Sequence, residues 1–178
     1  MKIVSGVILT LVYLFLLACG GSSSENKLNF ENDMEQVSFW NDNSNNVQTI
    51  VNYEDAHSGK YVCRTDSVYR YSYLFKSKLG NISDVPTLKV TAKMWIKVKT
   101  LDARASLVIS VDSLGTPIKW VENPIHPLIV NPNEWTEIKH ELIFEEYFTN
   151  PEFVLGCYLW NTGSYEVLVD DMSIEIMR

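Results

Sequence analysis

Apolar and polar residues alternate along most of this chain, in short segments separated by turn residues. Residues 88–99 show the pattern best, because the even positions are apolar and the odd positions are lysine, threonine or tryptophan. A two-residue period over this length predicts a β-strand with one buried face. Further segments that alternate similarly or are rich in aromatic residues are also expected to be strands: 61–65, 69–75, 105–111, 136–144, 153–160 and 167–177.

Turn-forming residues between these segments indicate the same fold class. The clusters are His57-Ser58-Gly59, Gly80-Asn81, Ser113-Leu114-Gly115, Asn131-Pro132-Asn133 and Asn161-Thr162-Gly163. No segment of ten or more residues has the amphipathic period of a helix, and no internal repeat is present. The pattern therefore predicts an all-β domain over residues 28–178, a jelly-roll β-sandwich of about eight or nine antiparallel strands. Residues 117–132 are expected to be its longest irregular stretch.

The N-terminus has the pattern of an export signal. A lysine precedes an almost wholly apolar segment, residues 3–17, which is short for a spanning helix of about 20 residues. Leu16-Leu17-Ala18-Cys19 then resembles the lipobox of bacterial lipoproteins. The resemblance implies that residues 1–18 are a signal peptide, that Cys19 is lipidated, and that residues 19–27 form a flexible tether. The alternative is a short uncleaved anchor.

Both alternatives hold the domain at a membrane outside the cytoplasm. The resemblance implies a lipid-anchored protein of the bacterial cell envelope, at the outer membrane or the cell surface. Without the signal peptide the chain has 14 basic and 22 acidic residues, a net charge of −8. An acidic domain of this kind has no basic footprint for nucleic acid and no polybasic patch for an anionic membrane.

The two cysteines beyond the N-terminal motif leave two alternatives open. Cys63 and Cys157 both lie in apolar segments with the pattern of strands. An exported domain could oxidise them to a disulfide, whereas buried free cysteine is a common small apolar residue in such positions. The zinc motifs CxxC and HExxH are absent from the sequence, so no zinc site is expected.

Four short motifs, in order, resemble the galactose-binding-like jelly rolls that include many carbohydrate-binding modules. They span nearly all of residues 28–178, and together they imply the fold more specifically than they imply a ligand. The motifs are Asn29-Phe30-Glu31, His57-Ser58-Gly59-Lys60-Tyr61, Asn133-Glu134-Trp135-Thr136, and Tyr158-Leu159-Trp160-Asn161 followed by Leu168-Val169-Asp170-Asp171-Met172.

The same resemblance implies a structural calcium ion. Asp170 shares its alternation with Leu168 and Met172, so its carboxylate is expected on the inward face, where it needs a partner. In the family, the corresponding glutamate and aspartate bind calcium with backbone carbonyls. In this chain they are Glu31 and Asp170, with carbonyls near Ser58 and Lys60. The alternatives are a strand that begins later, which leaves both aspartates in solvent, and an ion pair between Asp170 and Lys60.

Aromatic residues on outward positions suggest a ligand-binding surface. Trp95 alternates with Lys93 and Lys97, away from the apolar positions of its strand. Tyr158 and Trp160 likewise lie at the outward-facing positions of the strand expected over residues 153–160. Exposed rings beside polar groups suit a sugar, which has an apolar face and a rim of hydroxyls, so these five residues are predicted to bind a carbohydrate. The alternative is that loops fold over these outer faces and the tryptophans anchor them. The tyrosines at positions 69, 71 and 73 are expected in the core.

The sequence gives little support for an enzymatic function, because GxSxG, GxGxxG and P-loop motifs are absent. The sequence predicts a lipid-anchored, non-catalytic carbohydrate-binding domain. One alternative is a structural lipoprotein that binds an envelope protein. A weaker one is a small polysaccharide lyase or hydrolase, which would need two carboxylates placed on either side of a bound sugar.

Overall fold

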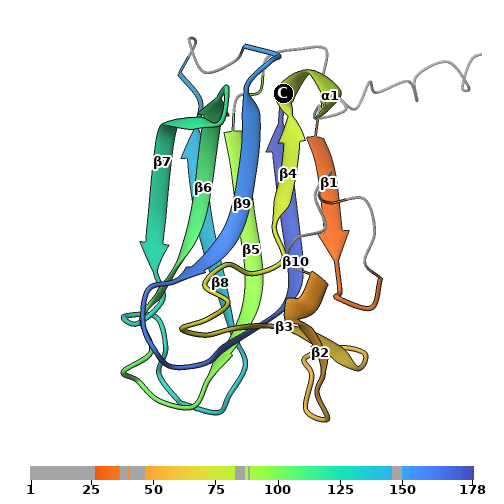
Figure 1. Ribbon diagram of the computed structural model, residues 1–178. Helices are drawn as coiled ribbons and strands as arrows, with labels where there is room; N and C mark the ends of the chain where they lie inside the picture. Colours follow the sequence, from red (N-terminus) through yellow and green to blue (C-terminus); the bar gives the residue numbers. More distant parts are fainter. Residues whose placement is uncertain (1–26, 37–39, 41–46, 83–86, 88, 146–149) are drawn as a thin grey trace, which may run out of the picture.

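The computed structural model describes residues 27–36, 40, 47–82, 87, 89–145 and 150–178 (Figure 1). Over this part of the chain, ten strands form two antiparallel sheets that pack face to face. Cys19 and the expected signal peptide lie outside the described residues. Among the helices that are described, none has the length and apolar character needed to span a bilayer.

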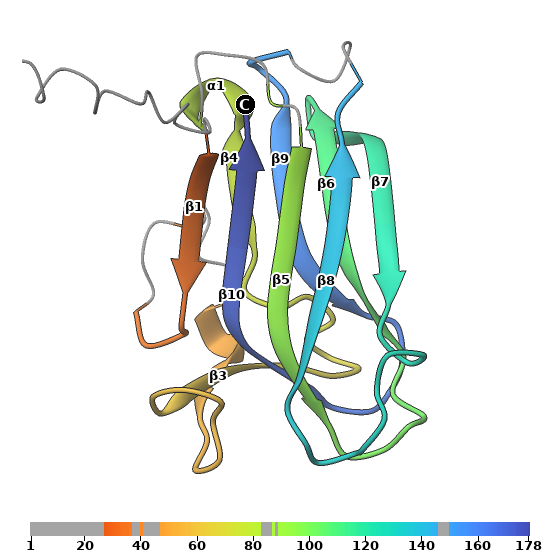
Figure 2. The same cartoon turned by 180° about the vertical axis from the view of Figure 1, so that it is seen from behind.

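The larger sheet, sheet A, faces the viewer in Figure 2. Its strand order is β2-β3-β10-β5-β8, and β1 also pairs with β10. The C-terminal strand β10 therefore lies at the centre of the sheet. The bounds are β1 Lys27–Asn32, β2 Ile50–Asn52, β3 Tyr61–Thr65, β5 Lys89–Val98, β8 Thr136–Ile143 and β10 Val167–Met177.

The smaller sheet, sheet B, lies in front in Figure 1 and has the order β4-β9-β6-β7. Its strands are β4 Phe75–Lys78, β6 Ala105–Ser113, β7 Thr116–Pro124 and β9 Val154–Asn161. Two short helices complete the described elements, the 3-10 helix η1 (Val47–Thr49) and α1 (Leu79–Ile82).

The predicted jelly-roll β-sandwich is confirmed, with ten strands in place of about eight or nine. The expectation of an irregular stretch from residue 117 is wrong for its first part, because residues 116–124 form β7. This strand is an edge strand that pairs only with β6, and it is mostly exposed, so no apolar face marks it in the sequence. Edge strands also tolerate proline, which is why Pro117 and Pro124 do not interrupt it.

Period-two alternation places one face of each sheet in a common core. Leu107 and Val111 of β6 pair with Leu159 and Leu155 of β9, and all four are buried in this core. Cys63 from sheet A and Cys157 from sheet B also lie there as buried free thiols. Burial raises the pKa of Cys63 to about 11 and raises that of Cys157 further, so both behave as small apolar side chains at neutral pH.

A β-bulge in β10 changes which residues face the core. Val169 pairs with Ile96, and both belong to the core, so the next residue, Asp170, faces outward. The register then shifts between Asp170 and Ser173, and Asp171 adopts a left-handed φ of 42°. Beyond this extra residue Met172 faces the core. The predicted inward phase of Asp170 is therefore wrong, because a single extra residue reverses the alternation within the strand.

Candidate functional site

The outer face of sheet B is covered by aromatic side chains. In β6 the residues Ser106, Val108 and Ser110 point away from the core, since the residues between them belong to it. They are nonetheless buried, and Val108 is 0% exposed. Because no further layer of secondary structure covers this face in Figure 1, side chains of the neighbouring strands must cover it.

We call these covering residues the aromatic face: Tyr71, Trp120, Tyr158 and Trp160. Trp120 and Trp160 meet edge to face with centroids 5.5 Å apart, and Tyr71 and Tyr158 do so at 5.7 Å. The indole N–H of Trp120 donates a hydrogen bond to the Tyr158 hydroxyl at 3.3 Å, which links the two pairs. Tyr71 is 48% and Trp120 is 38% exposed, so the outer side of the group is open to solvent.

Small residues beneath the rings make this arrangement possible. Ser110 pairs with Trp120 on one side and with Gly156 on the other. A Cβ atom at position 156 would lie 2.7 Å from the Ser110 hydroxyl oxygen, so any larger residue there would have to displace that hydroxyl. With small side chains in the middle of the sheet, the long side chains of its flanks can lie across it.

The phenol of Tyr158 remains a neutral donor and acceptor in this setting. Burial beneath its neighbours raises the pKa of Tyr158 above its ordinary value, and the nearby carboxylate of Asp112 adds to the increase. Its hydroxyl therefore stays protonated through the neutral range. The aromatic face thus offers flat apolar surfaces together with hydroxyl and indole N–H groups.

The other predicted ligand residues do not join this group. Trp95, Lys93 and Lys97 lie on β5 in sheet A, whereas Tyr158 and Trp160 lie on β9 in sheet B. Both outward phases are as predicted, but the two sheets turn their outer faces in opposite directions. The prediction that the five residues form one site is therefore wrong.

Loop residues occupy much of the outer face of sheet A around Trp95. His57 stacks on the indole with centroids 4.0 Å apart and an interplanar angle of 16°. Lys97 is only 8% exposed and forms an ion pair with Asp55. The Trp135 indole N–H also donates to the Asp55 carbonyl at 3.0 Å. For this face the alternative interpretation, in which a loop folds over the sheet and tryptophans anchor it, describes the structure.

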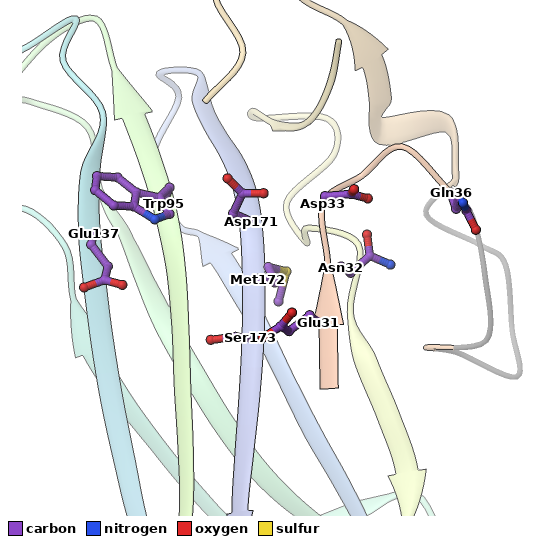
Figure 3. A pocket seen from close by; sticks show the side chains of 9 residues that line it. All are labelled: Glu31, Asn32, Asp33, Gln36, Trp95, Glu137, Asp171, Met172 and Ser173. Carbon is purple, nitrogen blue, oxygen red and sulfur yellow. The ribbon is translucent and has the colours of Figure 1, made fainter. Parts of the chain in front are cut away.

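A hollow of about 510 Å³ remains beside this loop on sheet A (Figure 3). Trp95 supplies its aromatic surface, and carboxylates from β8, β10, β1 and the turn after β1 surround it. The indole of Trp95 is already stacked on His57, so it offers a ligand less apolar surface than the four rings on sheet B. The lining residues are Glu31, Asn32, Asp33, Gln36, Trp95, Glu137, Asp171, Met172 and Ser173.

The residues predicted to bind calcium are not assembled as donors to one ion. Asp170 is 0% exposed, and its Oδ2 accepts hydrogen bonds from the amides of His57 at 2.9 Å and Ser58 at 3.1 Å. Its Oδ1 accepts from the Asp171 amide at 2.8 Å. Amide N–H groups, and not carbonyl oxygens, therefore meet this carboxylate, which does not fit cation coordination.

The partner residues in that predicted set lie elsewhere. Glu31 pairs with Ser173 on the edge of sheet A, where its carboxylate accepts a hydrogen bond from Asn29. The Lys60 amide donates to Glu35 at 2.6 Å. Among the residues that the structure describes, no group of three or more histidine, cysteine, aspartate or glutamate side chains could hold a metal ion. Calcium binding itself stays a prediction of the sequence.

The set of residues predicted to bind a carbohydrate lacks two members of the aromatic face. Tyr71 was expected in the core, but β4 begins only at Phe75, and Tyr71 forms an isolated bridge to Trp160 that leaves its ring outside. Trp120 lies in the stretch that was expected to be irregular. Its alternation with Ile118 and Glu122, both exposed, is the signal that could have placed it on a strand.

Comparison with known proteins finds the same fold. No protein-family model matches this chain, and no curated protein matches it. The structure of the CBM22-2 xylan-binding domain from Paenibacillus barcinonensis Xyn10C matches with a TM-score of 0.52 and 12% identity, over 82% of this chain and 97% of that chain. The CBM22-1–CBM22-2 tandem domain of the same protein matches with a TM-score of 0.52 and 15% identity, over 88% of this chain and 47% of that chain.

The resemblance to jelly-roll carbohydrate-binding modules is therefore confirmed at the level of the fold. At this sequence identity the likeness extends to the fold alone, since one fold carries many unrelated functions.

Proposed function

We propose that this protein is a non-catalytic carbohydrate-binding domain and that a glycan lies along the aromatic face of sheet B. The observation that carries the proposal is the group of four contacting aromatic side chains, of which Tyr71 and Trp120 are exposed and Tyr158 and Trp160 are half-buried. A sugar ring has an apolar face that stacks on such rings and hydroxyls that meet their polar atoms. Solved structures with this fold include domains named as xylan-binding, which supports the class of ligand.

The extent of the face favours a chain of sugars over a single one. From Trp120 on β7 the aromatic face crosses β6 and β9 and reaches Tyr71 beyond them. Neighbouring strands lie about 4.8 Å apart, so the three steps from β7 to the segment that contains Tyr71 span about 14 Å. This distance exceeds the width of one sugar ring. Several rings could therefore contact successive sugars of a polysaccharide.

Replacing Trp120 or Trp160 with alanine is expected to weaken binding at least about 30-fold, the loss of ~2 kcal/mol that central aromatic contacts typically carry. Affinity electrophoresis against a panel of soluble polysaccharides would find the ligand, and titration calorimetry would measure the change. The matched control is Trp95→Ala, which removes a tryptophan from the opposite sheet and is expected to leave binding unchanged.

Wild-type affinity in both sheet B variants, with their folding intact, would contradict this placement of the site. If every polysaccharide left the mobility of the wild-type protein unchanged and an envelope protein copurified with it, the alternative role as a protein-binding lipoprotein would be favoured.

The proposal includes a lipid anchor at Cys19, a signal peptide over residues 1–18 and a tether over residues 19–27. The lipobox-like motif supports lipidation at this one cysteine. Stable attachment to a membrane needs more than one acyl chain. Cys19→Ser is expected to abolish fatty-acid labelling and to prevent processing of the signal. Wild-type labelling and processing in this variant would contradict lipidation at Cys19, and an unprocessed wild-type protein would support the uncleaved anchor.

A further inference from the structure

Asp112 lies beside the aromatic face with an acceptor that the protein does not satisfy. It follows Val111, a core residue of β6, so its side chain points to the outer face of sheet B, where it is opposite Val154. The side chain is half-buried. Its Oδ1 is buried and has no hydrogen-bond partner among the residues that the structure describes.

The polar atoms of the aromatic face gather near this carboxylate. The negative charge of Asp112 is close enough to help raise the pKa of Tyr158, and the Ser110 hydroxyl also contacts that phenol. Trp120 donates to the same phenol. We call Asp112, Ser110 and the Tyr158 hydroxyl the polar edge of the aromatic face. Here a ligand could contact hydrogen-bonding groups while its apolar side lies on the rings.

A buried carboxylate oxygen without a donor in such a place requires a physical account. An ionised carboxylate can only accept hydrogen bonds, and leaving an oxygen buried without a donor is unfavourable. Native proteins rarely keep such an atom without a reason. The side chain as a whole is only half-buried, and rotation about its Cβ–Cγ bond is broad, so the carboxylate can turn the unsatisfied oxygen toward solvent. Either oxygen can therefore meet a donor that arrives from solvent.

We infer that Asp112 is the polar anchor of the site, where it accepts hydrogen bonds from the hydroxyl groups of a neutral glycan. The inference rests on the proposed function and deepens it, because it names the chemical class of the ligand. Sugar hydroxyls are donors, and hydrogen bonds to a charged acceptor are among the stronger ones in proteins. A glycan that carries carboxylate or sulfate groups would place negative charge against Asp112.

The other charges on this face agree with a neutral ligand. Glu122 adds a second, exposed carboxylate one strand away, opposite Val108. Lys78 at the far side forms an ion pair with Glu152 at 2.8 Å. Lys76, opposite Gly156, is the one outward-facing lysine of β4 for which the described residues provide no ion pair. The described outward charges therefore do not form a basic cluster that would attract an acidic glycan.

The test compares a neutral polysaccharide that retards the wild-type protein with a uronic-acid polysaccharide of similar length. Asp112→Asn is expected to weaken binding of the neutral polymer about tenfold or more, because an amide accepts more weakly than a carboxylate and exposes donors of its own. Glu122→Gln, the matched control, removes the same charge from the same face and is expected to leave that affinity unchanged. Lys76→Ala is also expected to leave it unchanged.

Three outcomes would overturn the assignment of Asp112 while the proposed function survives. One is wild-type affinity for the neutral polymer in Asp112→Asn, with Trp120→Ala still impaired. Another is an equal loss in Glu122→Gln, which would indicate a general effect of charge. The third is tighter binding of the uronic-acid polymer that depends on Lys76. If no polysaccharide bound the wild-type protein, the proposed function and this assignment would both be wrong.

Discussion

Alanine in place of Asp170 is expected to lower the free energy of unfolding by about 3 kcal/mol or more. The carboxylate is fully buried and accepts hydrogen bonds from the backbone amides of His57, Ser58 and Asp171. Alanine would leave these donors without a partner and would detach the loop that they hold against sheet A. Urea unfolding followed by tryptophan fluorescence measures the change.

A matched control separates this effect from simple loss of an acidic residue. Asp102 is an exposed aspartate in a turn, and Asp102→Ala is expected to change the free energy of unfolding by no more than about 0.5 kcal/mol. Similar stability of the two variants would show that the amides at residues 57, 58 and 171 find other partners. Melts of the wild-type protein with chelator or with added calcium test the predicted calcium ion, because an ion bound only by the folded state raises the melting temperature.

The contribution of the same carboxylate to stability is also expected to fall as the pH rises from about 4 to about 6. Burial raises the pKa of Asp170 from 3.8 to about 6 in the folded protein, and the neighbouring charge of Asp171 adds to the increase. Between these two values the folded state binds more protons than the unfolded state, so raising the pH favours unfolding. A shift of about two pKa units corresponds to about 3 kcal/mol over the whole titration, of which about 2 kcal/mol falls between pH 4 and pH 6.

The variant Asp170→Asn isolates this contribution, because its amide does not titrate. The difference in unfolding free energy between wild type and Asp170→Asn is expected to change by about 2 kcal/mol from pH 4 to pH 6 and to stay level above about pH 7. Measuring the difference cancels the titration of exposed groups such as Glu141, whose pKa is lowered by Lys139 and Lys89. A difference that is constant from pH 4 to pH 7 would contradict a raised pKa at position 170.

Local pattern was sufficient for the strands themselves. Alternation in residues 88–99 and 153–160 predicted β5 and β9, and it also placed Trp95, Tyr158 and Trp160 on outward positions. Successive side chains of a strand point to opposite faces, so a half-buried strand has apolar and polar residues at alternate positions. Neighbouring residues alone therefore indicate both the strand and its buried face. The lipobox-like motif at Cys19 is local in the same sense.

The candidate site depended on contacts between residues that are distant in the chain. Pairing placed β5 in one sheet and β9 in the other, which separated Trp95 from Trp160 and brought Trp120 beside Tyr158. The bulge at Asp171 reversed the phase of β10, and a loop more than a hundred residues earlier provided the amides that satisfy Asp170. Strand pairing joins segments that no local pattern relates, and one inserted residue reverses the faces, so alternation alone could predict which residues point outward but not which of them meet.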